Sequence, residues 1–140
     1  MVNYDINHIK NIVLVGHTGS GKTTLAEAMA FSSGSLKRCG TIDGKNTISD
    51  YTDIEHEKGK SFFAKLIKTN WEGYKINVLD TPGSDDFVGE ILGAMRVADC
   101  GVMLLNASTG IEVGTDMIWD YTADYKLPML IAVNQLDHEF

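Results

Sequence analysis

The sequence predicts an α/β fold, in which helices flank a mostly parallel sheet that carries one antiparallel hairpin. Two observations support this prediction. Strongly apolar, β-branched segments alternate with helical stretches along the chain, and a polar cluster directly follows three of the apolar segments. Because ligands of parallel sheets bind beyond the carboxyl ends of the strands, these three clusters are the candidate functional positions.

The first half of the chain predicts a strand, a helix and a long loop. Residues 9–15 predict the strand, because the run Ile12-Val13-Leu14-Val15 is apolar on both faces, as in a buried parallel strand. A glycine-rich loop follows, and residues 22–33 predict a helix. Residues 39–59 are polar with few apolar anchors, so we expect a long, mobile, functional loop. Its acidic side chains are expected to be solvated: Asp50, Asp53, Glu55 and Glu57.

The second half predicts a hairpin followed by alternating helices and strands. Residues 62–71 and 74–79 predict two strands joined at Glu72-Gly73. Amphipathic helices and buried apolar strands then alternate, with helices expected over 87–98 and 112–125 and strands over 102–105 and 129–133.

Composition limits the classes of function. A chain of 140 residues suits one domain, and its 44% of hydrophobic residues can form a core. The net charge of −7 (12 − 19) argues against autonomous nucleic-acid binding, which needs clustered Lys and Arg. No apolar run of about 18 residues and no leader-like N-terminus occur, so we expect no membrane span and a cytoplasmic location.

The first polar cluster predicts a phosphate-binding loop. The run Gly16-His17-Thr18-Gly19-Ser20-Gly21-Lys22-Thr23 fits G-x-x-x-x-G-K-S/T and lies between a predicted strand and a predicted helix. Its glycines let backbone N–H groups surround phosphate oxygens, and the helix N-terminus adds positive potential. We expect Lys22 to reach the β- and γ-phosphates and the Thr23 hydroxyl to bind Mg²⁺. The fold is therefore expected to be that of P-loop NTPases.

The other two clusters predict a metal-binding carboxylate and a base-reading loop. Asp80-Thr81-Pro82-Gly83 places a carboxylate where it can hold Mg²⁺ and a glycine N–H near a γ-phosphate. Asn134-Gln135-Leu136-Asp137 is N-x-x-D after an apolar strand. Its last carboxylate can accept from both N1–H and the 2-amino group of guanine, which adenine lacks, so Asp137 would select guanine. Asn134 could help to hold the base and brace the phosphate loop.

In this order, the three clusters resemble the GTP-binding domain of translational GTPases, with the greatest likeness to elongation factor G. Residues 80–90 resemble the second switch of that family, and residues 40–61 resemble the first switch of a divergent paralogue group. The resemblance implies a GTPase with GTP/GDP and Mg²⁺ as cofactors and the ribosome as partner of the parent factor. It also implies that Ser61 replaces the family's Mg²⁺-binding threonine, so that Thr23, Ser61 and Asp80 are the expected metal residues. The expected nucleotide contacts are Gly16, His17, Thr18, Gly19, Ser20, Gly21, Lys22, Thr23, Thr24, Asp80, Gly83, Asn134, Gln135 and Asp137.

Two positions depart from the family pattern. Ser84 stands where the family usually has a histidine that orients the attacking water, so we expect slow hydrolysis, with Ser84 and Lys22 as the candidate catalytic residues. We expect His17 to be exposed in the phosphate loop rather than to substitute for that histidine. Gln135 stands where the family has a lysine that packs over the base, which predicts weaker guanine affinity.

Two alternatives and one structural expectation remain. The chain could be a nucleotide-dependent binding module with little or no hydrolysis, which Ser84 favours, or a P-loop ATPase or kinase, against which Asn134 and Asp137 argue. The resemblance also implies that residues 1–140 are a GTP-binding domain truncated at its C-terminus, without the last strand and helix. An open apolar sheet edge and self-association through that edge are therefore expected.

Overall fold

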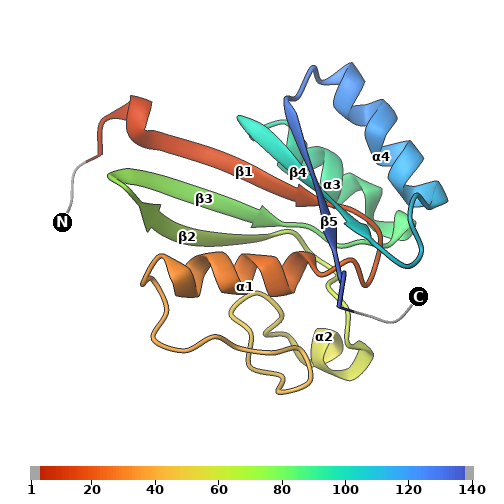
Figure 1. Cartoon of the computed structure of the whole chain (residues 1–140), viewed down its shortest axis with the longest axis horizontal. Helices are drawn as coiled ribbons and strands as arrows, with labels where there is room; N and C mark the ends of the chain where they lie inside the picture. The colour runs from red at the N-terminus through yellow and green to blue at the C-terminus, as the bar shows by residue number, and fades with distance from the viewer. Residues whose placement is uncertain (1–3, 138–140) are drawn as a thin grey trace.

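The computed structural model describes residues 4–137, which form a five-stranded sheet in the order β2-β3-β1-β4-β5 (Figure 1). Four strands run parallel, and they are β1 (Ile9–Val15), β3 (Tyr74–Asp80), β4 (Cys100–Asn106) and β5 (Met129–Asn134). The remaining strand, β2 (Lys65–Trp71), pairs antiparallel with β3. The predicted fold class, a mostly parallel sheet with one hairpin, is thereby confirmed.

Helices cover both faces of the sheet. The α1 helix (Lys22–Ser32) packs on one face, in a core cluster of Leu14, Ala26, Ala30, Ile67 and Val78. Helices α3 (Val88–Met95) and α4 (Val113–Asp124) contribute to the opposite core. The helix predicted over 87–98 is shorter than expected, because it ends at Met95, after which Val97 and Ala98 N–H bond carbonyls three residues back; a 3₁₀ turn, η2 (Asp85–Phe87), precedes it. Among residues 4–137, no helix combines the length and hydrophobicity that a membrane crossing requires.

The hairpin register brings the two outer ends of its strands together. Lys65, the first residue of β2, stands opposite Asp80, the last residue of β3, and Trp71 stands opposite Tyr74 at the turn. The β2 strand begins three residues later than predicted, because backbone N–H groups before it bond side chains instead of the ladder. Phe62 N–H donates to Glu55 and Ala64 N–H donates to Glu90.

The expectation of an unstructured loop over residues 39–59 is wrong in its second half. The α2 helix (Asp53–Lys58) begins at a capping box, in which the Thr52 hydroxyl accepts from Glu55 N–H, and ends at Gly59 with φ of 63°. The sequence signal was present, since T-x-x-E is typical of a capping box. The acidic side chains also differ from expectation: Asp53 and Glu57 are exposed, whereas Asp50 and Glu55 are buried.

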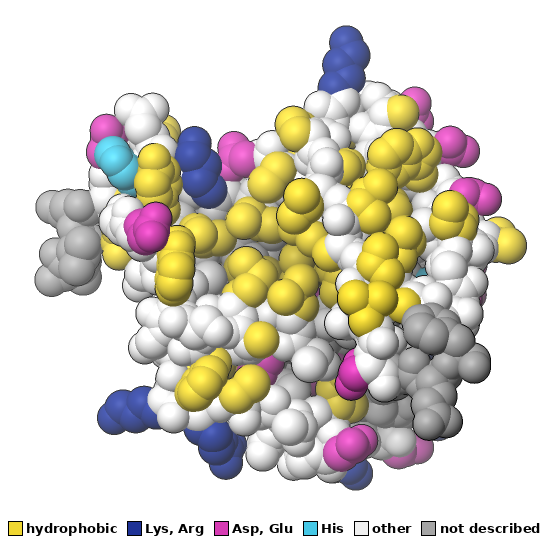
Figure 2. Space-filling model, viewed as in Figure 1, with side chains coloured by type: hydrophobic (Ala, Val, Ile, Leu, Met, Phe, Trp, Pro, Cys, Tyr) yellow, Lys and Arg dark blue, Asp and Glu magenta, His cyan; other side chains and the backbone are white. Residues whose placement is uncertain are grey.

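The β5 strand forms where predicted but is not buried. Leu130, Ile131 and Val133 keep 64%, 52% and 52% of their surface exposed. The strand pairs with β4 alone among the described strands, so it is an edge. Figure 2 shows hydrophobic side chains that gather on the face of the molecule toward the viewer, where β5 lies at the front in Figure 1. Apolarity alone predicted burial here, but burial also requires an element packed over each face of the strand.

Candidate functional site

A loop of residues 16–21 joins the carboxyl end of β1, the central strand of the sheet, to the start of α1. Gly21 adopts φ of 96°, which L side chains rarely adopt, and a Cβ there would overlap the Asn134 amide nitrogen. A side chain at this position would separate the loop from β5. The glycine therefore brings the loop and the C-terminal cluster into contact.

Lys22, at the start of α1, lies beneath this loop and is 6% exposed. Its ammonium donates to the carbonyl oxygens of Gly16 at 2.8 Å and His17 at 2.9 Å. Burial lowers the pKa of Lys22 to about 8, against the opposing influence of Asp80 and Asp50. A charged ammonium held on loop carbonyls is already desolvated and directed into the loop, where an anion would add charge-assisted hydrogen bonds.

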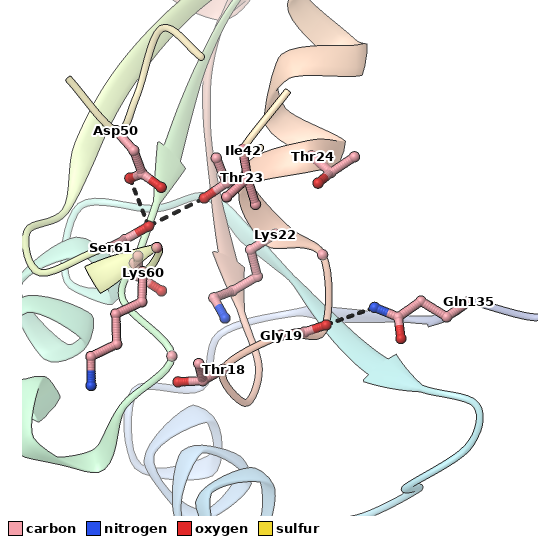
Figure 3. Close-up of a pocket in the computed structure, with 14 residues that line it drawn as sticks. Thr18, Gly19, Lys22, Thr23, Thr24, Ile42, Asp50, Lys60, Ser61 and Gln135 are labelled. Atoms are coloured by element: carbon pink, nitrogen blue, oxygen red, sulfur yellow. Dashed lines mark hydrogen bonds between the residues drawn. The ribbon is translucent and has the colours of Figure 1, made fainter. Parts of the chain in front are cut away.

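Hydroxyl and carboxylate oxygens converge at the start of α1, and Figure 3 shows those of Thr23, Ser61 and Asp50. Thr23 Oγ1 donates to Asp80 Oδ2 at 2.7 Å and lies 3.2 Å from Ser61 Oγ. Ser61 Oγ in turn donates to Asp50 Oδ1 at 2.8 Å. These contacts bring four parts of the chain together: α1, the end of β3, the segment between α2 and β2, and Asp50 before α2.

Both carboxyl groups of this cluster have a raised pKa. Burial raises the pKa of Asp80 to about 6, although the Thr23 hydroxyl and Lys22 act in the opposite direction. Burial also raises the pKa of Asp50. Asp80 Oδ1 is buried and has no hydrogen-bond partner among the described residues. A divalent cation with oxygen ligands fits this donor set, because carboxylate and hydroxyl oxygens are the ligands that Mg²⁺ prefers.

Among residues 4–137, no group of three or more His, Cys, Asp or Glu side chains is arranged to hold a metal ion. Any Mg²⁺ site here would therefore depend on hydroxyls and on a ligand's own oxygens as well as on carboxylates. This is the usual arrangement for Mg²⁺ bound together with phosphates.

The second cluster approaches the phosphate loop through its glycine. A Cβ on Gly83 would lie 2.5 Å from Lys22 Nζ and 2.5 Å from the Thr18 backbone nitrogen. Thr81 is fully buried, and its hydroxyl donates to the Leu14 carbonyl at 2.6 Å. Ser84 turns away from the loop: its hydroxyl donates to Asp86 Oδ2 at 3.3 Å, and it does not line the cavity described below.

The third cluster holds the phosphate loop from the other side. Asn134 Nδ2 donates to the Ser20 carbonyl at 2.9 Å, and Gln135 Nε2 donates to the Gly19 carbonyl at 2.7 Å. Gln135 adopts φ of 61°, which turns its side chain back over the loop. Asp137 is exposed and lies outside the cavity.

A cavity of about 230 Å³ lies between these segments. Nine of the expected site residues line it, namely Thr18, Gly19, Gly21, Lys22, Thr23, Thr24, Ser61, Gly83 and Gln135. Seven do not, namely Gly16, His17, Ser20, Asp80, Ser84, Asn134 and Asp137. The sequence reading missed five lining residues: Ile42, Asp50, Gly59, Lys60 and Thr81.

The missed residues left weak signals in the sequence. Asp50 belongs to Ser49-Asp50-Tyr51, which was part of the first-switch resemblance, but its charge was interpreted as solvated. His17 keeps 37% of its side chain exposed and does not line the cavity, and its Nε2 lies 3.1 Å from Glu112 Oε2. This contact joins the phosphate loop to the start of α4, which no pattern in the sequence indicated.

Comparison with known proteins gives a consistent result. The family described as "Elongation factor Tu GTP binding domain" matches residues 7–139. A mitochondrial ribosome-releasing factor 2 of Lodderomyces elongisporus is 39% identical over 91% of this chain and 16% of its own length. Elongation factor G 2 of Borreliella afzelii is 35% identical over 92% of this chain and 19% of its own length. The chain thus spans less than a fifth of each of these two relatives.

Solved structures share the fold. A crystal structure of a Thermus thermophilus protein superposes with a TM-score of 0.89 at 36% identity, over 93% of this chain and 20% of that protein. Elongation factor SelB of Methanococcus maripaludis, solved with the GTP analogue GppNHp, gives a TM-score of 0.71 at 17% identity, over 94% of this chain and 23% of that one. At that identity, the second similarity shows the fold alone.

Proposed function

Because this chain belongs to the family of elongation factor Tu GTP-binding domains, we propose that it is a Mg²⁺-dependent switch that binds and hydrolyses GTP. The resemblance to elongation factor G noted from the sequence is confirmed by the relatives, and it favours guanine nucleotides over the ATPase or kinase alternative. We further propose that residues 1–140 act as one nucleotide-binding domain.

One observation carries the proposal: the side-chain oxygens of Thr23, Asp80 and Ser61 meet at the start of α1, where Thr23 and Asp80 are buried and Asp80 interacts electrostatically with the Lys22 ammonium. We assign Lys22 to the phosphate oxygens and the three oxygen-bearing side chains to Mg²⁺, with Asp50 orienting Ser61. Bound Mg²⁺ would neutralise phosphate charge in the cavity. We assign the Gly83 N–H to a third phosphate, because Gly83 lies against Lys22 Nζ and the Thr18 backbone nitrogen.

We propose that Asp137 reads the guanine edge while Asn134 and Gln135 hold the phosphate loop. Calorimetric titration of the chain with GTP and with ATP, each with Mg²⁺, tests this assignment. We expect GTP to bind more tightly, and Asp137→Asn to abolish most of that preference. A preference that Asp137→Asn leaves unchanged would remove the guanine assignment.

A second candidate, a nucleotide-dependent binding module with little hydrolysis, is favoured by the position of Ser84. Its hydroxyl bonds Asp86 and does not line the cavity, so it supplies no group that could orient water there. Single-turnover phosphate release with and without ribosomes separates the two candidates. Release that ribosomes stimulate supports the GTPase, and bound GTP that stays intact in both conditions supports the module.

The partner is proposed from the relatives. The names of two of them refer to ribosome release and to elongation factor G. We therefore propose that the protein acts on the ribosome in a translating compartment, with the cytoplasm as the expected location. Co-sedimentation with ribosomes in the presence of a non-hydrolysable GTP analogue and of GDP measures this, and we expect more protein in the pellet with the analogue.

A further inference from the structure

A buried ion pair, Glu55 with Lys65, joins α2 to β2, and neither of its residues lines the cavity. Lys65 Nζ lies 2.9 Å from Glu55 Oε2, and their side chains are 9% and 0% exposed. Glu55 Oε2 also accepts from the Thr52 hydroxyl at 2.7 Å, while Oε1 accepts from the Phe62 N–H at 3.1 Å. One carboxylate therefore connects the start of α2, the residue after Ser61 and the first residue of β2.

The surroundings of Glu55 favour its charged form. Burial acts to raise the pKa of Glu55, but Lys65, Thr52 and the Phe62 N–H together lower it below its ordinary value. The Lys65 ammonium also lies 4.2 Å from the centre of the Tyr51 ring and 5.5 Å from that of Phe63. Such cation–π contacts are strongest where the cation is shielded from water. Loss of either charge would leave the other buried without its partner.

The pair fixes residues 61–64, a short segment that contacts both the cavity and the residues after Gly83, at Phe87 and Glu90. Ser61 faces Thr23 and Asp50 in the cavity, and the next residue, Phe62, packs its ring edge-on against Phe87 at 5.0 Å. Two residues on, the Ala64 N–H donates to Glu90 Oε2 on α3 at 2.8 Å. Neither Glu55 nor Lys65 lines the cavity; they act on it through the segment that carries Ser61 and through their charges on Asp50.

We propose that Glu55, paired with Lys65, is a positioning residue that holds Ser61 at the cavity and so sets how strongly the chain prefers GTP to GDP. This inference rests on the proposed function, because Ser61 is the hydroxyl assigned to Mg²⁺. A ligand that must also order the segment binds more weakly by the free energy of that ordering. With Glu55 in place, the segment is ordered before GTP·Mg²⁺ arrives.

The first experiment uses no nucleotide. Hydrogen–deuterium exchange of the full chain is compared for the wild type, Glu55→Gln and a matched control, Glu57→Gln. Glu57 lies on the same helix and forms an exposed pair with Lys58 at 3.2 Å, where loss of charge has little effect. We expect Glu55→Gln to speed exchange over residues 60–64 by about tenfold or more, and Glu57→Gln to leave it unchanged. Unchanged exchange in Glu55→Gln would overturn the proposal.

The second experiment measures dissociation constants for GDP and for a non-hydrolysable GTP analogue, both with Mg²⁺. We expect Glu55→Gln to weaken the analogue by about tenfold and GDP by less than about twofold. Equal weakening of both would indicate a general structural role and overturn the proposal. If Glu55→Gln does not fold, Glu55→Gln with Lys65→Met removes both buried charges and takes the same test. A wild type that binds neither nucleotide contradicts the proposed function. The exchange experiment tests separately whether Glu55 holds residues 60–64 in place.

Discussion

Asp80 lowers the stability of the ligand-free chain, and the size of this penalty depends on pH. The carboxylate is 1% exposed, accepts one hydrogen bond from Thr23, and keeps Oδ1 without a partner among the described residues. Burial raises its pKa from the ordinary 3.8 to about 6. A carboxyl with a raised pKa in the folded state binds protons more readily there than in the unfolded chain. Stability therefore falls as pH rises from 3.8 to about 6 and stays lowered above that.

The size of the effect follows from the two pKa values. The difference between 3.8 and about 6, at 1.36 kcal/mol per pH unit, corresponds to about 3 kcal/mol. Roughly 2 kcal/mol of it falls between about pH 4.5 and about pH 7. Lys22, with its pKa lowered to about 8, stays protonated through most of this interval and adds little to the slope.

Urea unfolding of the ligand-free wild type and of Asp80→Asn across this interval measures the penalty. We expect the wild type to lose about 2 kcal/mol more than Asp80→Asn on going from the lower to the higher pH. The comparison cancels titration of groups that the two chains share. Parallel pH dependences for the two chains would refute the reasoning, because Asp80 would then titrate as it does in water.

Three further predictions concern the packing around the site. Gly83→Ala places a Cβ 2.5 Å from Lys22 Nζ and from the Thr18 nitrogen, so we expect a loss of about 1–3 kcal/mol in urea unfolding and weaker GTP binding in calorimetry. Glu27→Gln, on a buried carboxylate that accepts from the N–H groups of Gly40 and Ile48, should cost about 1–3 kcal/mol and speed proteolysis within residues 39–48, and an unchanged cleavage rate would contradict it. Ile131→Lys on the exposed β5 strand should shift self-association to higher concentration in analytical ultracentrifugation, and equal association of both chains would exclude that edge.

The sequence predicted the regular elements well because their signals are local. The first strand, Ile9–Val15, carries its pattern within seven residues, and the phosphate-loop motif fixes both the turn and the start of α1. Thr23, Asp80 and Ser61 could be expected near one another because the carboxyl ends of parallel strands share an edge and because the resemblance supplied the first switch. Their mutual distances were not predictable.

What the sequence did not predict depends on partners distant in the chain. Glu55 reads as a solvated residue in an acidic run, and its burial is made favourable by Lys65 at the start of β2 together with the Thr52 hydroxyl and the Phe62 N–H. Leu130 reads as core, but a strand pattern does not tell whether an element covers each face. His17 likewise contacts Glu112, which lies beyond three strands and three α-helices in the sequence.

The lengths of the two arms of the β2–β3 hairpin determine which residues stand opposite each other at its open end. Its two arms are seven residues each, and the ladder aligns Lys65 with Asp80 at the far end from the turn. The number of residues counted from Glu72-Gly73 therefore sets Lys65, the partner of Glu55, beside Asp80. Insertion of one residue into either arm would move every rung beyond it and reverse the faces of that arm. The number of residues in each arm of the hairpin thus governs whether the pair that holds Ser61 lies beside the carboxylate of the candidate site.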